Sequence, residues 1–152
     1  MQKRTSQSKE KGWKAKEAVQ ASNRCMSANQ KWHWLHMIAF FMKGKDSQKS
    51  SNLFAGTDHA NYRHLNIELE VPYLLKHFPN GLTIYGNVIS DANDVAKSFT
   101  YNIATDDFTL EFRIDAQSLV QPNVIEGEYV HSFVKAVVER NEEKKVAMRL
   151  RF

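Results

Sequence analysis

The sequence predicts a mainly β fold of the α+β class. We expect an antiparallel sheet or sandwich of about seven strands, one or two short helices, and a flexible basic N-terminal arm. Several segments alternate apolar and polar residues, turn residues separate them, and positive charge is concentrated before residue 50. The length of 152 residues is that of a single domain. Within it we expect a flexible or marginally helical arm over residues 1–30 and a compact β-rich domain over residues 31–152.

Residues 31–45, KWHWLHMIAFFMKGK, contain the longest uncharged apolar run of the chain. The eleven residues from Trp32 to Met42 include no acid, lysine or arginine. A helix needs about 20 apolar residues to cross a bilayer, so this run does not predict a membrane span. Because it is aromatic-rich, apolar on almost every side and ended by Gly44, we interpret it as the first strand, buried on both faces.

The segments that follow predict a loop, two strands and a helical turn. Residues 43–63 are polar and predict a long loop. Residues 64–71, HLNIELEV, alternate apolar and polar side chains, which predicts a half-buried strand. Pro72 stands where proline begins a helix and predicts one short turn, PYLLKHF. Residues 82–89, LTIYGNVI, predict the next strand.

The clearest hairpin joins residues 98–104 to residues 108–115. Apolar side chains occupy alternate positions of both arms, and Thr-Asp-Asp forms the turn. Residues 128–138 and 146–152 predict a last pair of strands around a charged turn. A helix through residues 128–146 is the competing interpretation, because Glu, Lys and Ala are common there. Strands do not alternate regularly with helices, so we expect antiparallel pairing.

Positive charge is concentrated in the first third of the chain. Residues 1–50 contain eleven Lys or Arg and three acids, whereas residues 51–152 carry a net charge of −4. A basic arm is typical of proteins that bind nucleic acid or anionic lipid. A solvated tail, or an arm that docks on a second copy of the chain, is the alternative. The residues predicted to bind the anion are Lys3, Arg4, Lys9, Lys11, Lys14, Lys16, Arg24, Lys31, Trp32, Trp34, Lys43, Lys45 and Lys49.

The sequence contains no signature of nucleophilic catalysis or of a phosphate-binding loop. Its single cysteine, Cys25, has no partner for an internal disulfide. His33 and His36 would point to opposite faces of a strand, which separates them as metal ligands. We therefore predict no catalytic residue, no bound metal and no cofactor. The nearest approach to a metal or acid–base cluster is the set Asp58, His59, His64 and Glu68.

A basic flexible arm ahead of a β-rich domain is the layout of many small viral coat, matrix and nucleoproteins, an analogy of architecture only. Our first hypothesis is a non-enzymatic assembly protein that self-associates through its β domain. It would bind single-stranded nucleic acid or an anionic membrane surface through residues 3–49. The second is a protein-binding adaptor or regulator that uses the 43–63 loop or a strand edge. The third is a small metal-dependent enzyme using His59, His64 and Glu68.

The N-terminal residues also bear on location. They are charged and include no apolar segment of the kind found in secretory signals. We therefore expect a protein of the cytoplasm, the nucleus or a virion that is not secreted, forms a homo-oligomer and has no transmembrane span.

Overall fold

The structure is a computed structural model that describes residues 7–22, 30–38, 42, 46–47, 49–141 and 146–151, the last of these as backbone. Helices and strands are interspersed along the chain. In order, the elements are α1 (Gln7–Lys11), α2 (Ala15–Ala21), β1 (Trp32–His36), η2 (Ser50–Asn52), β2 (Leu53–Thr57), α4 (Asp58–Glu68), α5 (Val71–His77), β3 (Thr83–Ser90), β4 (Ala96–Ala104), β5 (Phe108–Asp115), α6 (Val124–Arg140) and β6 (Val146–Arg151).

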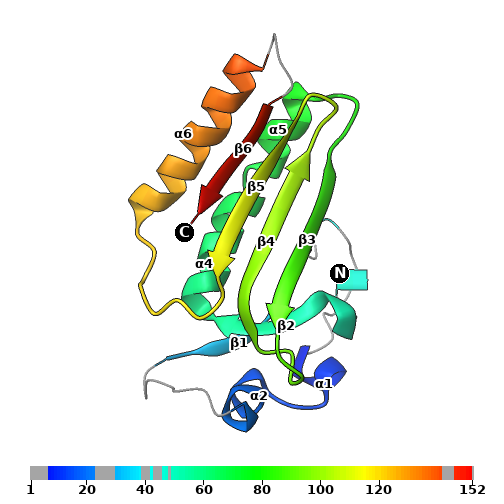
Figure 1. Cartoon of the computed structure of the whole chain (residues 1–152), viewed down its shortest axis with the longest axis vertical. Coiled ribbons are helices and arrows are strands. Elements are labelled where there is room, and N and C mark those ends of the chain that lie inside the picture. The colour runs from blue at the N-terminus through cyan, green and yellow to red at the C-terminus, as the bar shows by residue number, and fades with distance from the viewer. Residues whose placement is uncertain are drawn as a thin grey trace, which may run out of the picture.

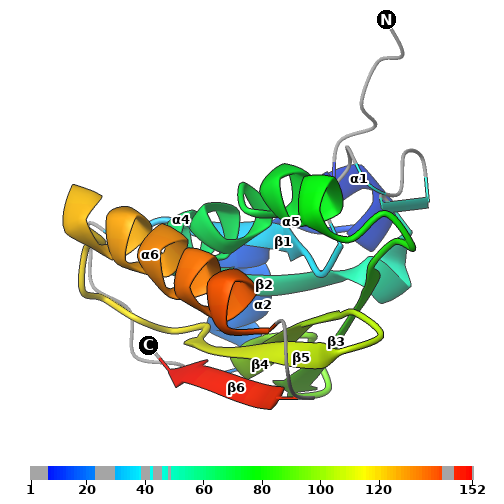
Figure 2. The same cartoon turned by 90° about the horizontal axis from the view of Figure 1, so that it is seen from above.

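The main layer is a four-stranded sheet with the strand order β3-β4-β5-β6 (Figure 1). Strands β3, β4 and β5 are antiparallel neighbours, and β6 pairs parallel to β5 with Phe108 opposite Val146. Helices α4, α5 and α6 all lie on one face of this sheet (Figure 2). A separate antiparallel pair, β1 and β2, joins His36 to Leu53 and lies beside α1 and α2.

The seven-stranded sandwich predicted from the sequence is wrong. The described residues form one sheet of four strands and one of two, with helices covering one face of the larger sheet. The prediction failed because two segments that read as strands are helices, α4 and α6. The exclusively antiparallel pairing is also wrong, since α6 is the crossover that brings β6 alongside β5 in parallel.

Residues 64–71 belong mainly to helix α4 rather than to a strand. The hydroxyl oxygen of Thr57 accepts a hydrogen bond from the backbone N–H of Ala60 at 3.2 Å and caps the helix. Ala60, His64 and Ile67 are buried at helical spacing. Leu65 and Leu69 fitted the two-residue period but are 42% and 61% exposed. The two-residue alternation of apolar residues in this segment therefore arose by chance within a helical pattern.

Residues 128–138 lie in helix α6, so the strand predicted there is wrong. The competing interpretation, a helix, gives the correct secondary structure. The helix starts at Val124, where the side-chain oxygen of Asn123 accepts from the Glu126 N–H at 3.1 Å. Its buried residues are Val130, Val134 and Val137, which share one face.

Several other predicted elements are confirmed. The helical turn after residue 71 is α5, and the strand at residues 82–89 is β3. The β4–β5 hairpin pairs Phe99 with Ile114 and Ile103 with Leu110, as the alternation predicted. The first strand exists but ends at His36, and residues 39–41 and 43–45 lie outside the described residues. The long loop predicted over residues 43–63 is wrong from residue 50 onward, because η2, β2 and the start of α4 occupy that part of it.

Two clusters of buried apolar side chains hold these elements together. The main core contains 18 buried residues between the large sheet and helices α4, α5 and α6. The N-terminal core contains six: Ala15, Ala18 and Val19 of α2, Trp34, Ala55 and Val95. The pair β1–β2 separates the cores, because Trp34 belongs to the N-terminal core and its neighbour Leu35 to the main core.

Candidate functional site

Helix α2 presents lysines to solvent because two of its three alanines and its valine are buried on the other side. Ala15, Ala18 and Val19 pack against β1 and β2, so Lys14 and Lys16 are exposed. The indole N–H of Trp34 donates to the backbone carbonyl of Trp13 at 2.9 Å, which ties the entry of α2 to the hairpin. The orientation of the α2 lysines is therefore set by the N-terminal core.

The acids of the N-terminal region are engaged in backbone hydrogen bonds. A carboxylate oxygen of Glu17 accepts from the Lys14 N–H at 2.7 Å, and one of Glu10 accepts from the Ser50 N–H at 3.3 Å. The described lysines of α1, α2 and the start of β1 are exposed, apart from Lys11. We call these four residues the basic surface: Lys9, Lys14, Lys16 and Lys31.

Other predicted binding residues serve the fold or make their own contacts. Lys11 has a side chain only 4% exposed, forms an ion pair with Asp94 at 2.7 Å, and lies over the Trp34 ring. Trp34 is itself buried, and Trp32 is half-buried. Lys49 pairs with Asp46 at 2.9 Å on the surface. The remaining five lie outside the described residues: Lys3, Arg4, Arg24, Lys43 and Lys45.

A second group of polar side chains lies where α4 meets β4. His64 is buried, and its ring contacts those of Phe99 and Tyr101 at 5.0 and 4.8 Å between centroids. Its Nε2 is 3.3 Å from a carboxylate oxygen of Glu68, one helical turn later. Burial, and secondarily the charge of His36, lowers the pKa of His64 from 6.5 to about 3. His64 is therefore a neutral imidazole at pH 7.

Tyr101 completes this buried group. Its hydroxyl donates to the sulfur of Met42 at 3.8 Å. Burial first, and the negative charge of Glu68 second, raises the pKa of Tyr101 well above its usual value, so the phenol stays protonated. A carboxylate, a neutral imidazole and a phenol thus share one buried environment.

His36 is the half-exposed neighbour of that group and the last residue of β1. The side-chain nitrogen of Gln7 lies 3.3 and 3.5 Å from its two ring nitrogens. Asn52 fixes the backbone just beyond it, because its amide accepts from the Ile38 N–H at 3.0 Å and donates to the Ile38 carbonyl at 2.9 Å. We call the following set the imidazole cluster: His36, His64, Glu68 and Tyr101.

The sequence did not predict His36 as a site residue, because only His33 was considered as its partner. The two do lie on opposite faces of β1, as expected. The neighbour that matters is His64, 28 positions later on a helix that the sequence predicted as a strand. The usable signal was the cap at Thr57, which would have placed His64 and Glu68 on one helical face.

The predicted cluster of Asp58, His59, His64 and Glu68 is not assembled as one site. His64 and Glu68 face the interior, whereas Asp58 and His59 line a polar pocket at the surface. Among the residues that the structure describes, no group of three or more His, Cys, Asp and Glu side chains is arranged to hold a metal ion.

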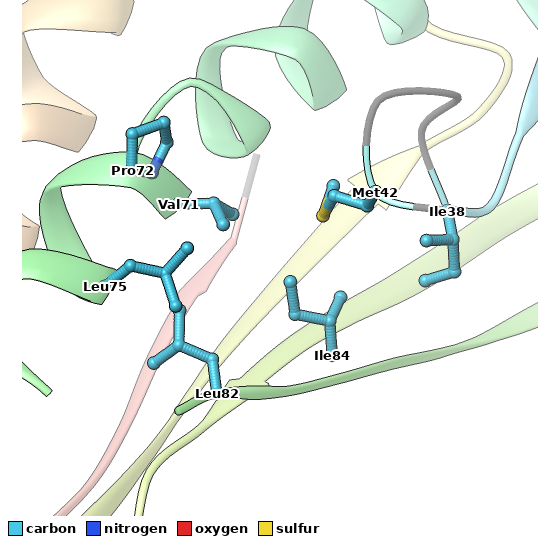
Figure 3. A pocket seen from close by; sticks show the side chains of 7 residues that line it. All are labelled: Ile38, Met42, Val71, Pro72, Leu75, Leu82 and Ile84. Atoms are coloured by element: carbon cyan, nitrogen blue, oxygen red, sulfur yellow. The ribbon is translucent and has the colours of Figure 1, made fainter. Parts of the chain in front are cut away.

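An apolar pocket of about 590 Å³ opens between α5, the start of β3 and the side chains of Ile38 and Met42 (Figure 3). Met42 links it to Tyr101. The described side chains of its walls include no acid, base or hydrogen-bonding group, so they supply contact area rather than chemistry. The lining residues are Ile38, Met42, Val71, Pro72, Leu75, Leu82 and Ile84.

Comparison with known proteins finds no matching family model, no matching curated protein and no matching solved structure. Within the described part of the chain, no helix has both the length and the apolar character that crossing a membrane requires.

Proposed function

We propose that the protein binds single-stranded nucleic acid through the basic surface on α1, α2 and β1. The observation that carries this proposal is the difference between the contacts of the acidic and the basic side chains near the N-terminus. Glu10 and Glu17 are exposed, but each accepts a hydrogen bond from a backbone N–H group, and Lys14 and Lys16 are exposed beside them in the sequence. Exposed lysines that displace counterions from phosphates give salt-dependent affinity for a polyanion.

Nucleic acid is favoured over a lipid surface by the apolar residues of α2. A helix that lies on a membrane inserts an apolar face among the lipids. The apolar face of α2 is already occupied, since Ala15, Ala18 and Val19 pack against the β1–β2 hairpin. Its exposed side is polar, which suits phosphates better than acyl chains.

The test compares two triple variants on a salt series. Lys14→Ala, Lys16→Ala and Lys31→Ala together should weaken binding to a single-stranded oligonucleotide. For single strands the slope of log K against log salt falls by about 0.7 for each lost phosphate contact, so we expect a change of about 2. The matched control replaces three exposed lysines elsewhere: Lys76, Lys97 and Lys135.

An unchanged slope in the first variant, or an equal change in the control, would contradict this proposal. Phosphatidylserine vesicles form the second arm of the experiment. Binding to vesicles but not to the oligonucleotide would assign the basic surface to a membrane instead.

A second proposal, that the protein also hydrolyses the bound strand, is favoured by the imidazole cluster. His36 is half-exposed at a strand end that Asn52 fixes, and the buried His64 stays neutral beneath it. Neutral His64 therefore places no positive charge against a proton on His36. A histidine in this setting can act as a general base. The carboxylate of Glu68 lies 3.3 Å from the imidazole of His64.

The proposed step is phosphodiester hydrolysis. His36 accepts a proton from water as the water oxygen forms a bond to phosphorus, and the bond from phosphorus to one ester oxygen breaks. The leaving oxygen takes a proton from solvent or from the His36 imidazolium. Because substrate phosphates commonly carry Mg²⁺, the reaction is run with and without that ion.

The test measures cleavage of a labelled single strand on a denaturing gel. His36→Ala should lower the rate by about 10²-fold or more, the usual contribution of a general base, and leave binding intact. His33→Ala, on the opposite face of the same strand, is the matched control. Binding without cleavage by the wild-type protein would overturn the second proposal and leave a non-enzymatic assembly protein.

A further inference from the structure

A polar pocket of about 490 Å³ lies between the first turns of α4 and the loop before α6. This volume lies within the range of small-ligand pockets. The helix contributes Asp58, His59, Tyr62 and Asn66, and the loop contributes Gln121 and Asn123.

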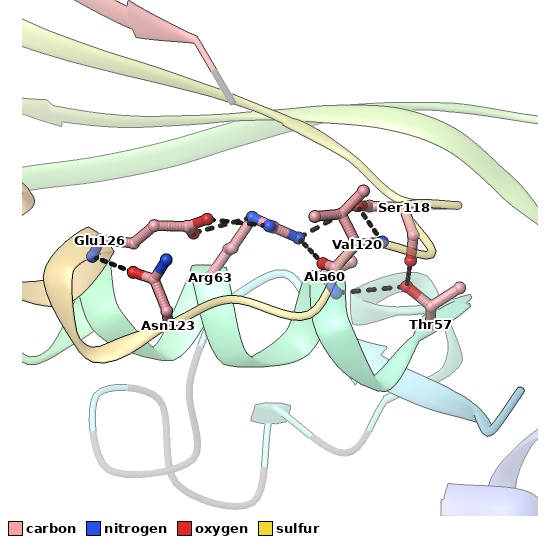
Figure 4. A network of polar contacts seen from close by, with 7 residues as sticks. All are labelled: Thr57, Ala60, Arg63, Ser118, Val120, Asn123 and Glu126. Atoms are coloured by element: carbon pink, nitrogen blue, oxygen red, sulfur yellow. Dashed lines mark hydrogen bonds and ion pairs between the residues drawn. The ribbon is translucent and has the colours of Figure 1, made fainter.

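The loop wall of the pocket is fixed by Arg63 (Figure 4). Arg63 is 7% exposed and binds both carboxylate oxygens of Glu126 at 3.0 Å. Its remaining nitrogen donates to the hydroxyl of Ser118 at 3.0 Å and to the backbone carbonyl of Val120 at 2.8 Å. One buried guanidinium thus joins α4, the loop and α6, so the pocket is formed before any ligand arrives.

The lining of the pocket suits a neutral polar ring better than a phosphate. Its side chains include three amides and no lysine or arginine, and the carboxylate of Asp58 would repel an anion. The Nδ1 atom of His59 is buried and makes no hydrogen bond to a described residue. Amide, carboxylate and imidazole groups are those that pair with base edges in unstacked nucleic acid.

An aromatic ring and a lysine flank the opening. The ring of Tyr62 is on a residue 58% exposed, so one face is open for stacking. The backbone N–H of Asp58 donates to the Lys31 carbonyl at 3.2 Å. The carboxylate of Asp58 accepts a hydrogen bond from the side chain of Gln30 at 2.7 Å. The exposed Lys31 of the basic surface is therefore next to the pocket.

We infer that this pocket holds one unstacked base of the single strand whose phosphates meet the basic surface, an inference that rests on the proposed binding function. The base stacks on Tyr62, and its edge bonds to Asn66 and to the loop amides. Lys31 contacts the neighbouring phosphate. The protein then reads bases as well as charge.

The experiment compares two probes of equal length: a normal single-stranded oligonucleotide and one that is abasic throughout. The wild-type protein should bind the normal strand about tenfold more tightly, the value of one stacked base. Tyr62→Ala should abolish that ratio and leave the affinity for the abasic strand unchanged. Lys31→Ala should weaken binding to both probes by the same factor.

Tyr129→Ala is the matched control, because Tyr129 is a tyrosine 57% exposed on α6 that does not line the pocket. Equal affinity of the wild type for both probes, or equal loss in the two tyrosine variants, would overturn the base pocket while binding itself stands. Failure to bind either probe would overturn the proposed function as well. Melting curves of each variant show whether a loss reflects unfolding.

Discussion

The main core and the N-terminal core differ in the number and size of the side chains that form them. The main core closes a four-stranded sheet with three helices, and aromatic rings contact one another within it. The N-terminal core consists of three small side chains of α2 with Trp34, Ala55 and Val95, and the half-buried rings of Trp13 and Trp32 pack against it. Among the described residues of this core, Trp34 is the only large side chain that is buried. Its replacement should therefore weaken the attachment of α2 more than the replacement of any other residue of the N-terminal core.

The two cores also differ in what polar groups they contain. The main core surrounds Glu68 and His64, and burial lowers the pKa of His64. The N-terminal core has Lys11 at its border, paired with Asp94, which itself is 54% exposed in its side chain. Acidification should therefore act mainly on the main core, and loss of apolar contacts should act on both.

The largest expected effect is that of Phe99→Ala in the main core. Phe99 is 1% exposed and lies 4.8 Å from the ring of Phe54. Truncating a buried Phe costs about 3–5 kcal/mol, so the free energy of unfolding in urea should fall by that amount. Ile89→Ala, at a position 53% exposed, should change it by less than about 0.5 kcal/mol. A loss below about 1 kcal/mol in Phe99→Ala would contradict the assigned core.

Trp34→Ala tests whether the N-terminal core opens by itself. We expect the free energy of opening, measured by hydrogen exchange, to fall by at least about 2 kcal/mol. The fall should be confined to the backbone amides of α2, β1 and β2. Trp34→Phe keeps the ring contacts but removes the N–H bonded to the Trp13 carbonyl, at a cost of about 1 kcal/mol. Equal loss of protection in β4 and β5 would mean that the two cores unfold as one unit.

A third expected effect is the pH dependence that His64 confers. Its pKa of about 3 in the folded state lies below the unfolded value of 6.5, so the unfolded chain binds more protons between these limits. Stability should therefore rise with pH across that window, by up to about 1.4 kcal/mol per unit, and fall on acidification. His64→Gln should flatten the urea-derived stability slope, while His33→Gln should not. A slope that persists in His64→Gln would assign the acid sensitivity to other groups.

Sequence patterns succeeded where the structure depends on neighbouring residues. The β4–β5 hairpin was predicted because both arms alternate and a three-residue turn joins them. Helix α5 was predicted from Pro72 at its start. These elements are specified locally, so one sequence contains enough information to place them.

Prediction from the sequence failed where the two-residue period of a strand and the period of a helix place the same residues inside. Ile67 is inside in both the two-residue pattern and the helical pattern of α4, and Val71 is buried at the start of α5. Only the exposure of Leu65 and Leu69 separates the interpretations, and exposure is a property of the assembled fold. The parallel pairing of β6 likewise depends on α6 being a crossover helix.

Part of the candidate site was visible in the sequence and part was not. The concentration of lysines near the N-terminus follows from charge counts, which require no fold, but the burial of Lys11 against Asp94 and Trp34 does not. The relation between His36 and His64 appears only when β1 ends at His36 and α4 replaces a strand. The polar pocket requires Arg63 to bind Glu126, 63 positions away.

The ion pair between Lys11 and Asp94 spans 83 positions of the chain. During synthesis at about 5–20 residues per second, α1 would wait roughly 4–17 s before its partner is made. The β4–β5 hairpin needs no such delay once its own residues have appeared. We therefore expect the contact between Lys11 and Asp94 to form only after the intervening residues have been synthesised, whereas the two arms of the hairpin are neighbours in the chain.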